Sequence, residues 1–134
     1  MGSQSVVVGI DVRKVSGQYV IYSHCASTPH FDVKLLDYVC YTQKLGAGEI
    51  FINSIDRDGM MQGYDLQLLT LVRSNTSLPL IACGGAGHFR HLVEAFQEAH
   101  VNAVGCASLF HFGDNNPLRA KAYLKNHGIP LKSI

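Results

Sequence analysis

The chain has 134 residues, of which 47% are hydrophobic and 16% are charged, and its formal net charge is +1. This length suits one domain with a core of its own, and a charge near zero excludes the basic surface on which nucleic-acid binding depends. No apolar run reaches the roughly 18 residues of a membrane helix and no signal peptide is recognisable, so we predict a cytoplasmic protein with no nucleic-acid or membrane partner.

Four short apolar segments predict buried β-strands. They cover residues 5–11, 49–56, 78–85 and 102–110, and each is rich in β-branched or small residues. Continuous apolar character, rather than strict alternation, is typical of parallel strands that are covered on both faces. Residues 17–25 do alternate, which predicts an inserted hairpin or an extended loop. Residues 1–4 are interpreted as a tag or a disordered start, which leaves 5–134 as a single domain.

Helical periodicity follows each strand. The first helix is predicted over residues 32–46, with Asp32 as its N-cap and Gly46 at its end. Its inward face is predicted to carry Val33, Leu36, Val39, Cys40 and Gln43. The second helix is predicted over residues 65–75, with Asp65 as its N-cap and with Leu68, Leu69 and Val72 turned inward.

Two further helices complete a repeating β-α order. One is predicted over residues 88–100, with Phe89, Leu92, Val93 and Phe96 at helical spacing, and one over residues 116–128, with Pro117 at its first turn and Gly128 past its end. Right-handed crossovers then give a parallel sheet with outer helices. The pattern fits either an open doubly wound sheet or half of a (β/α) barrel.

Polar residues follow the strands at the edge where a parallel α/β sheet carries its site. Asp11 closes the first predicted strand, residues 53–59 the second, residues 83–87 the third, and Ala107 and Ser108 the fourth. The glycine-rich turn 83–87 lets backbone N–H groups approach an anion, and Ser108 can add a hydroxyl. The alternative is a tight turn that needs only positive φ.

The carboxylates allow several interpretations. Asp56 and Asp58 point to the same side of an extended chain, but with no histidine or third carboxylate nearby they do not indicate a metal site, and we expect none. Asp58 before a glycine is typical of a turn. Asp11 can act as a general acid or base, or it can pair with Arg13 or Lys14.

Two groups of side chains have simpler interpretations. His88 and His91 favour a solvated helix start over a metal site, because no other ligand is near them in sequence. Cys83 and Cys106 end apolar runs and are interpreted as core residues, and the four cysteines form no C-x-x-C pair.

The stretches "LGAGEIFINSIDRDGMMQGYDLQLL" and "LPLIACGGAGHFRHLVEAF", with "ASLFHF" and "LKNHGI", closely resemble the cyclase subunit family of imidazole glycerol phosphate synthase. The resemblance runs from about Ser5 to about Ile129 and covers strands five to eight of that family's barrel. It therefore implies a (β/α)4 half of a TIM barrel.

The resemblance also implies an activity. In that family, ammonia from a glutaminase partner reacts at the rim with a phosphoribulosyl aminoimidazole carboxamide nucleotide, giving imidazole glycerol phosphate and a purine precursor. Asp11 matches one of two catalytic aspartates, and Asn53, Asp56 and Gly84 match the substrate rim. One phosphate half-site is matched by Asp58, Gly59, Gly85, Ala107 and Ser108. No cofactor is implied.

Departures from the family pattern leave alternatives open. Cys83 stands where the family has a serine, and "HCASTP" at residues 24–29 replaces a Ser-Gly turn. The stretch at 53–65 is also similar to paralogous barrels that serve amidation of surface sugars. We expect the chain alone to be inactive, and we expect it to associate with itself or with an N-terminal half, because four parallel strands leave two open edges and an apolar inner face.

Overall fold

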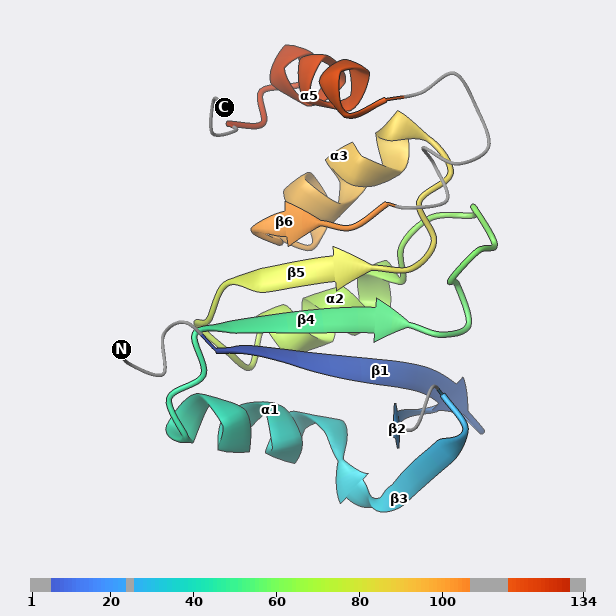
Figure 1. Ribbon diagram of the computed structural model, residues 1–134, viewed down its shortest axis with the longest axis vertical. Coiled ribbons are helices and arrows are strands. Elements are labelled where there is room, and N and C mark those ends of the chain that lie inside the picture. Colours follow the sequence, from blue (N-terminus) through green and yellow to red (C-terminus); the bar gives the residue numbers. More distant parts are fainter. Residues whose placement is uncertain (1–5, 24–25, 107–115, 131–134) are drawn as a thin grey trace.

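The computed structural model describes residues 6–23, 26–106 and 116–130. Its strands are β1 (Val7–Val15), β2 (Gln18–Ser23), β3 (Thr28–Lys34), β4 (Glu49–Ser54), β5 (Leu80–Cys83) and β6 (Ala103–Val104). Its helices are α1 (Leu35–Lys44), α2 (Leu66–Arg73), α3 (Phe89–Glu98) and α5 (Pro117–Asn126). The strands form one six-stranded sheet in the order β3-β2-β1-β4-β5-β6 (Figure 1).

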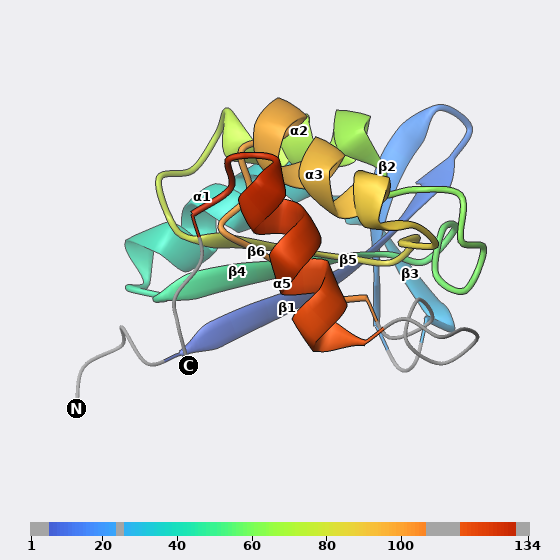
Figure 2. The same cartoon turned by 90° about the horizontal axis from the view of Figure 1, so that it is seen from above.

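The parallel part of this sheet is the predicted α/β arrangement. Strands β1, β4, β5 and β6 pair in parallel, and α1, α2 and α3 connect them in turn. Figure 2 shows these three helices on one face of the sheet. Four parallel strands with helices on their outer side are consistent with half of a TIM barrel, so the predicted fold class is confirmed.

The predicted insertion is a β-hairpin that joins the sheet. Ser16 and Gly17 both have positive φ, which is the conformation of a two-residue turn matched to the twist of paired strands. The hairpin pairs β2 with residues 11–15, so β1 runs on to Val15. The prediction that the first strand ends at Asp11 is therefore wrong, although the part of β1 that pairs with β4 does end at Val12.

The hairpin also shifts the first helix. Residues 28–34 form β3 against β2, so α1 begins at Leu35, and Lys34 occupies the N-cap position without a side-chain bond. The predicted N-cap Asp32 is thus wrong. Of the predicted inward face only Val39 is fully buried, and Cys40 is exposed, because the buried residues of α1 are Leu35, Val39 and Thr42. Gly46, with φ +88°, follows the helix end as predicted.

The remaining helices agree with the sequence pattern in position and face, although each is shorter than predicted. Asp65 caps α2 through a bond from the Leu68 N–H to its Oδ1 (3.0 Å), and Leu68, Leu69 and Val72 are buried. Helix α5 begins at Pro117 and packs on α3, at the end of the molecule beyond β6 (Figure 1). Their contact is a second small core of Leu92, Val93, Leu124 and Ile129.

The side chains on the two faces of the sheet are buried to different extents. On the helix side the inward residues are almost completely buried: Ile10, Val12, Ile50, Ile52, Leu80 and Ala82. The opposite face, which lines the interior of a closed barrel, is less covered, and Val7 there is 52% exposed. Asp11, Asn53 and Cys83 belong to this second face, since side chains alternate along a strand.

Candidate functional site

Three polar side chains form a row across the second face of the sheet. The strand registers pair Asp11 with Asn53 and Asn53 with Cys83, so the three residues stand on adjacent strands at the same level. The Asn53 Nδ2 donates a hydrogen bond to the Asp11 Oδ1 at 3.2 Å. The other end of the amide, the Asn53 Oδ1, is buried and accepts no hydrogen bond within the described part of the chain. The row thus offers a carboxylate held by an amide and one unused acceptor.

The glycine-rich turn after β5 adopts a conformation that only glycine tolerates. Gly84 and Gly85 have φ of +90° and +121°. A Cβ on Gly84 would lie 2.6 Å from the Ser54 carbonyl oxygen and 2.9 Å from the Asn53 Oδ1. The turn therefore lies directly against the end of β4, and the absence of side chains is what allows this close backbone approach.

The segment after β4 folds back as a turn beside this glycine turn. The Asp58 N–H donates to the Ser54 carbonyl at 3.0 Å, and Gly59 follows with φ +79°. A small hollow of about 30 Å³ lies between the two turns. Its lining is Asp58, Cys83, Gly84, Gly85, Ala86, Gly105 and Cys106. Two of the predicted phosphate-binding residues, Asp58 and Gly85, are thus brought together with Gly84, whereas Ala107 and Ser108 lie outside the described residues.

The thiols beside this hollow stay protonated at neutral pH. Burial raises the pKa of Cys83, and the nearby Asp58 carboxylate raises it further. Burial and Cys83 together raise the pKa of Cys106 to about 11. Both thiols line the hollow, and Cys106 also packs against both cores, as the sequence predicted. Neutral thiols add no negative charge that would repel an anion.

Asp56 is bound by the extended part of β1. The Lys14 N–H donates to the Asp56 Oδ2 at 2.8 Å, and the Arg13 Nε lies 3.5 Å from the Asp56 Oδ1. Arg57, in contrast, donates to the carbonyls of Gly63 and Tyr64 at 3.4 and 3.3 Å. Asp56 therefore ties the segment after β4 to the hairpin end of β1, and Asp11 is left to Asn53.

Two more residues complete the site: Tyr64, which the sequence did not single out, and His91, which the sequence assigns to a solvated helix start but which is half-buried. Tyr64 is 3% exposed, and its hydroxyl donates to the Gly105 carbonyl at 2.7 Å, which joins the segment before α2 to the chain after β6. Burial raises the pKa of this phenol. His91 accepts a hydrogen bond from the Gly87 N–H on its Nδ1 at 3.1 Å. Neither contact has a local sequence signal. Tyr64 and Gly105 are distant in the chain, and the bond from Gly87 to His91 depends on how the glycine turn folds.

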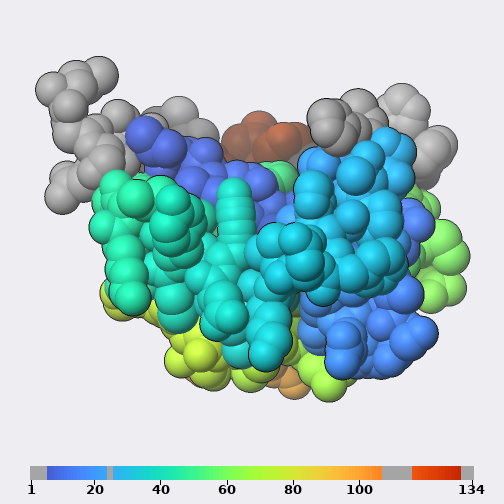
Figure 3. Space-filling model, turned by 90° about the horizontal axis from the view of Figure 1, so that it is seen from below, coloured from blue at the N-terminus to red at the C-terminus, as the bar shows by residue number. Residues whose placement is uncertain are grey.

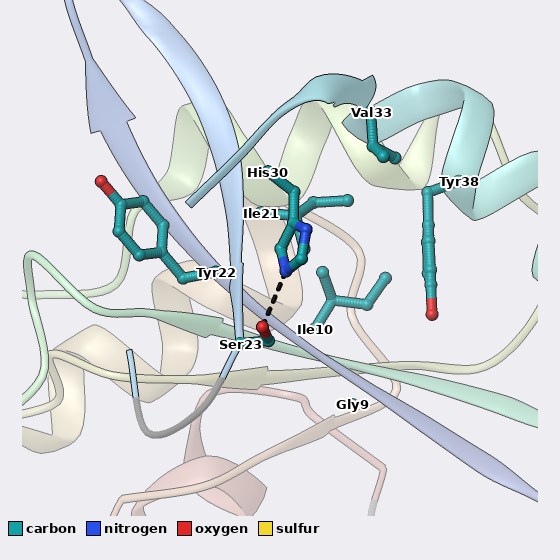
Figure 4. Close-up of a pocket in the computed structure, with 8 residues that line it drawn as sticks. All are labelled: Gly9, Ile10, Ile21, Tyr22, Ser23, His30, Val33 and Tyr38. Atoms are coloured by element: carbon teal, nitrogen blue, oxygen red, sulfur yellow. Dashed lines mark hydrogen bonds between the residues drawn. The ribbon is translucent and has the colours of Figure 1, made fainter. Parts of the chain in front are cut away.

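A larger pocket lies elsewhere, between the hairpin and α1. Its volume is about 300 Å³, and its lining is Gly9, Ile10, Ile21, Tyr22, Ser23, His30, Val33 and Tyr38. The Ser23 Oγ and the His30 Nε2 are 2.7 Å apart inside it, while Tyr22 points away from the other side chains (Figure 4). Ile10 and Ile21 belong to the buried helix side of the sheet, so this pocket is separate from the Asp11 row.

Two kinds of feature are absent from the described ranges. Residues 6–23, 26–106 and 116–130 contain no group of three or more His, Cys, Asp or Glu side chains arranged to hold a metal ion. Within the same ranges no helix has both the length and the apolar character to cross a membrane.

Comparison with known proteins gives a consistent picture. The family model described as "Histidine biosynthesis protein" matches residues 1–116. Imidazole glycerol phosphate synthase subunit HisF of Chlorobaculum parvum is 44% identical over 131 residues, which are 98% of this chain and 52% of that protein. The same subunit of Chlorobaculum tepidum is 41% identical with the same coverage. The chain thus spans about half the length of the curated relatives that it matches.

Proposed function

The chain belongs to the histidine biosynthesis protein family, and from this premise we propose that it is the C-terminal half of a cyclase barrel like that of imidazole glycerol phosphate synthase. It would contribute one catalytic aspartate, Asp11, and one phosphate half-site. The observation that carries the proposal is the register of β1, β4 and β5, which aligns Asp11 with Asn53 and brings Asn53 next to the glycine turn.

In the proposed reaction Asp11 transfers protons during the ammonia-dependent cyclisation and cleavage of the phosphoribulosyl substrate. Asn53 would fix the orientation of the carboxylate through the 3.2 Å bond, which leaves the second carboxylate oxygen for the reacting group. Asn53 and Gly84 would border the substrate, with Asp56 at the outer rim. The second aspartate of the family belongs to the other half of the barrel.

The phosphate half-site would be formed by the two turns around the small hollow. Backbone N–H groups of Gly59 and Gly85 are the proposed donors, and Ala107 and Ser108 would add to them as the family resemblance implies. Asp58 supports the turn through its backbone bond to Ser54. A glutaminase subunit would supply ammonia to the completed barrel.

The free edge of β1 supports association with a second half-barrel. Pairing with β2 begins at Asp11, so no described strand pairs with Val7–Ile10 on the side away from β4. Beside this edge, a groove of about 230 Å³ lies between β1 and α1, on the end of the molecule seen in Figure 3. Tyr41 and Leu45 next to it are 60% and 64% exposed. An unpaired edge next to exposed apolar side chains favours a protein partner, either the N-terminal half or a second copy.

A complementation assay tests the proposal. The chain is mixed with the N-terminal half of the Chlorobaculum parvum relative, and turnover of the phosphoribulosyl substrate with ammonium is measured beside sedimentation of each sample. We expect turnover only in the mixture, none with Asp11→Asn, and a dimer of the chain when it is alone. Turnover by Asp11→Asn at the wild-type rate would contradict the catalytic assignment, and a stable monomer would contradict self-association.

A further inference from the structure

The glycine turn and the segment 61–63, which follows the other turn of the proposed anion site, contact each other backbone to backbone. The Gly63 N–H donates to the Gly85 carbonyl at 2.7 Å. A Cβ on Gly85 would overlap the Gly63 carbonyl oxygen, and a Cβ on Gly87 would overlap the Met61 carbonyl oxygen. The shape of the glycine turn therefore depends on the segment 61–63, and whatever holds these two segments together also sets the positions of the donors.

His91 contacts both segments from the first turn of α3. Its Nδ1 accepts the hydrogen bond from the Gly87 N–H at 3.1 Å. Its ring also lies beside Gly63, where the distance from the Cδ2 to a Cβ on that glycine would be 3.4 Å. One imidazole thus orients the Ala86–Gly87 peptide by a hydrogen bond and packs against the neighbouring segment.

We propose that His91 is a positioning residue for the anion site, which in its neutral form holds the glycine turn against the segment ending at Gly63 and releases that turn when it is protonated. This inference rests on the proposed phosphate half-site. To that half-site the inference adds a residue that does not touch the anion, and it makes anion binding depend on pH.

The chemistry of the contact fixes the direction of the effect. Nδ1 can accept a bond only while it carries no proton, so neutral His91 has its proton on Nε2. A proton on Nδ1 would turn an acceptor into a donor that faces the Gly87 N–H. The charged form loses the bond, so acid should loosen the turn.

The surroundings of the ring agree with this direction. Burial lowers the pKa of His91 below its ordinary value of 6.5, and His88 and Arg90 lower it further, while Glu94 opposes them. The two packed segments, 61–63 and 84–87, contain no titratable side chain. Neutral His91 is therefore the form that the fold favours, and its contribution is complete above pH 6.5 and is lost as the pH falls below that value.

The test uses sulfate, which stays a dianion across the range, and measures its affinity for the full chain between pH 8 and pH 5 by NMR titration. Wild-type affinity should fall as the pH drops below 6.5, by up to roughly fivefold to tenfold once His91 is protonated, the size expected for one neutral hydrogen bond. His91→Asn keeps an acceptor near the Nδ1 position without a titrating group, so it should bind at pH 7.5 almost as the wild type does and show a flat pH profile. His91→Ala should be weak at every pH.

The matched control is His88→Asn, because the ring of His88 lies 6.2 Å from that of His91 and Asn also serves as an N-cap. This variant should keep the acid-dependent fall in affinity, with its midpoint moved to higher pH because His88 no longer lowers the pKa of His91. The inference is overturned if His91→Ala binds sulfate like the wild type at pH 7.5, or if acid strengthens binding to the wild type.

A second measurement separates this inference from the proposed half-site. The amide signal of Gly87 should follow the titration of His91 without any anion, and it should lose this dependence in His91→Asn. If sulfate fails to bind the wild type, the half-site is wrong. If sulfate binds but Gly87 does not follow His91, the half-site stands and the positioning role is wrong.

Discussion

Replacement of Gly85 by alanine is expected to destabilise the protein through a contact between two loops. Gly85 has φ +121°, and an added Cβ would overlap the Gly63 carbonyl oxygen. The Arg57 Cβ is a further neighbour at 3.2 Å. The positive φ is a property of the backbone and the Gly63 oxygen is a backbone atom, so no side-chain rotation can relieve either conflict.

The magnitude follows from two parts. A non-glycine residue in such a sparsely populated conformation costs about 1–3 kcal/mol. Moving the segment away would also break the Gly63-to-Gly85 hydrogen bond, which contributes about 1 kcal/mol. Together these give about 2–4 kcal/mol, a large share of the roughly 5–15 kcal/mol that stabilises a typical domain.

Urea unfolding followed by far-UV circular dichroism measures the effect. Gly17→Ala is the matched control, because Gly17 has φ +81° and no atom lies within 4 Å of an added Cβ. Gly59→Ala is a second control, with φ +79° and the same open surroundings, but inside the proposed anion site. We expect Gly85→Ala to lose at least about 1 kcal/mol more than either control, since the controls carry only the conformational cost. Equal midpoints for all three variants would refute the loop contact.

Two further predictions concern buried groups near the site. Tyr64→Phe should lower the free energy of unfolding by about 1–2 kcal/mol in the same urea assay, because it removes the 2.7 Å bond to the Gly105 carbonyl, and an unchanged midpoint would contradict that bond. Iodoacetamide should label exposed Cys40 well before Cys106 at pH 8, because the pKa of Cys106 is raised to about 11 and only its thiolate reacts. The Cys106 rate should keep rising about tenfold per pH unit up to pH 10, and mass spectrometry of the labelled peptides reports both rates.

Local sequence patterns determined most of the element order. Continuous apolar segments predicted the four parallel strands, and N-cap and glycine signals placed α2 and the end of α1 near their observed positions. These predictions hold because apolar runs, capping bonds and glycine conformations involve residues that are close together in the sequence. The family resemblance, which extends over almost the whole chain, then selected the half-barrel from two architectures that periodicity left equal.

Contacts between distant segments were decided only by the tertiary structure. The hairpin continues β1 past Asp11 and moves the start of α1 from Asp32 to Leu35, because pairing with β2 competes with the helical pattern. The bond from Asn53 to Asp11 joins residues 42 positions apart and follows from strand register. Likewise, His91 and Gly63 act on the glycine turn only because the fold brings three separate segments together. Short sequence patterns do not encode strand register or contacts between loops, so only the tertiary structure decides which residues hold the site.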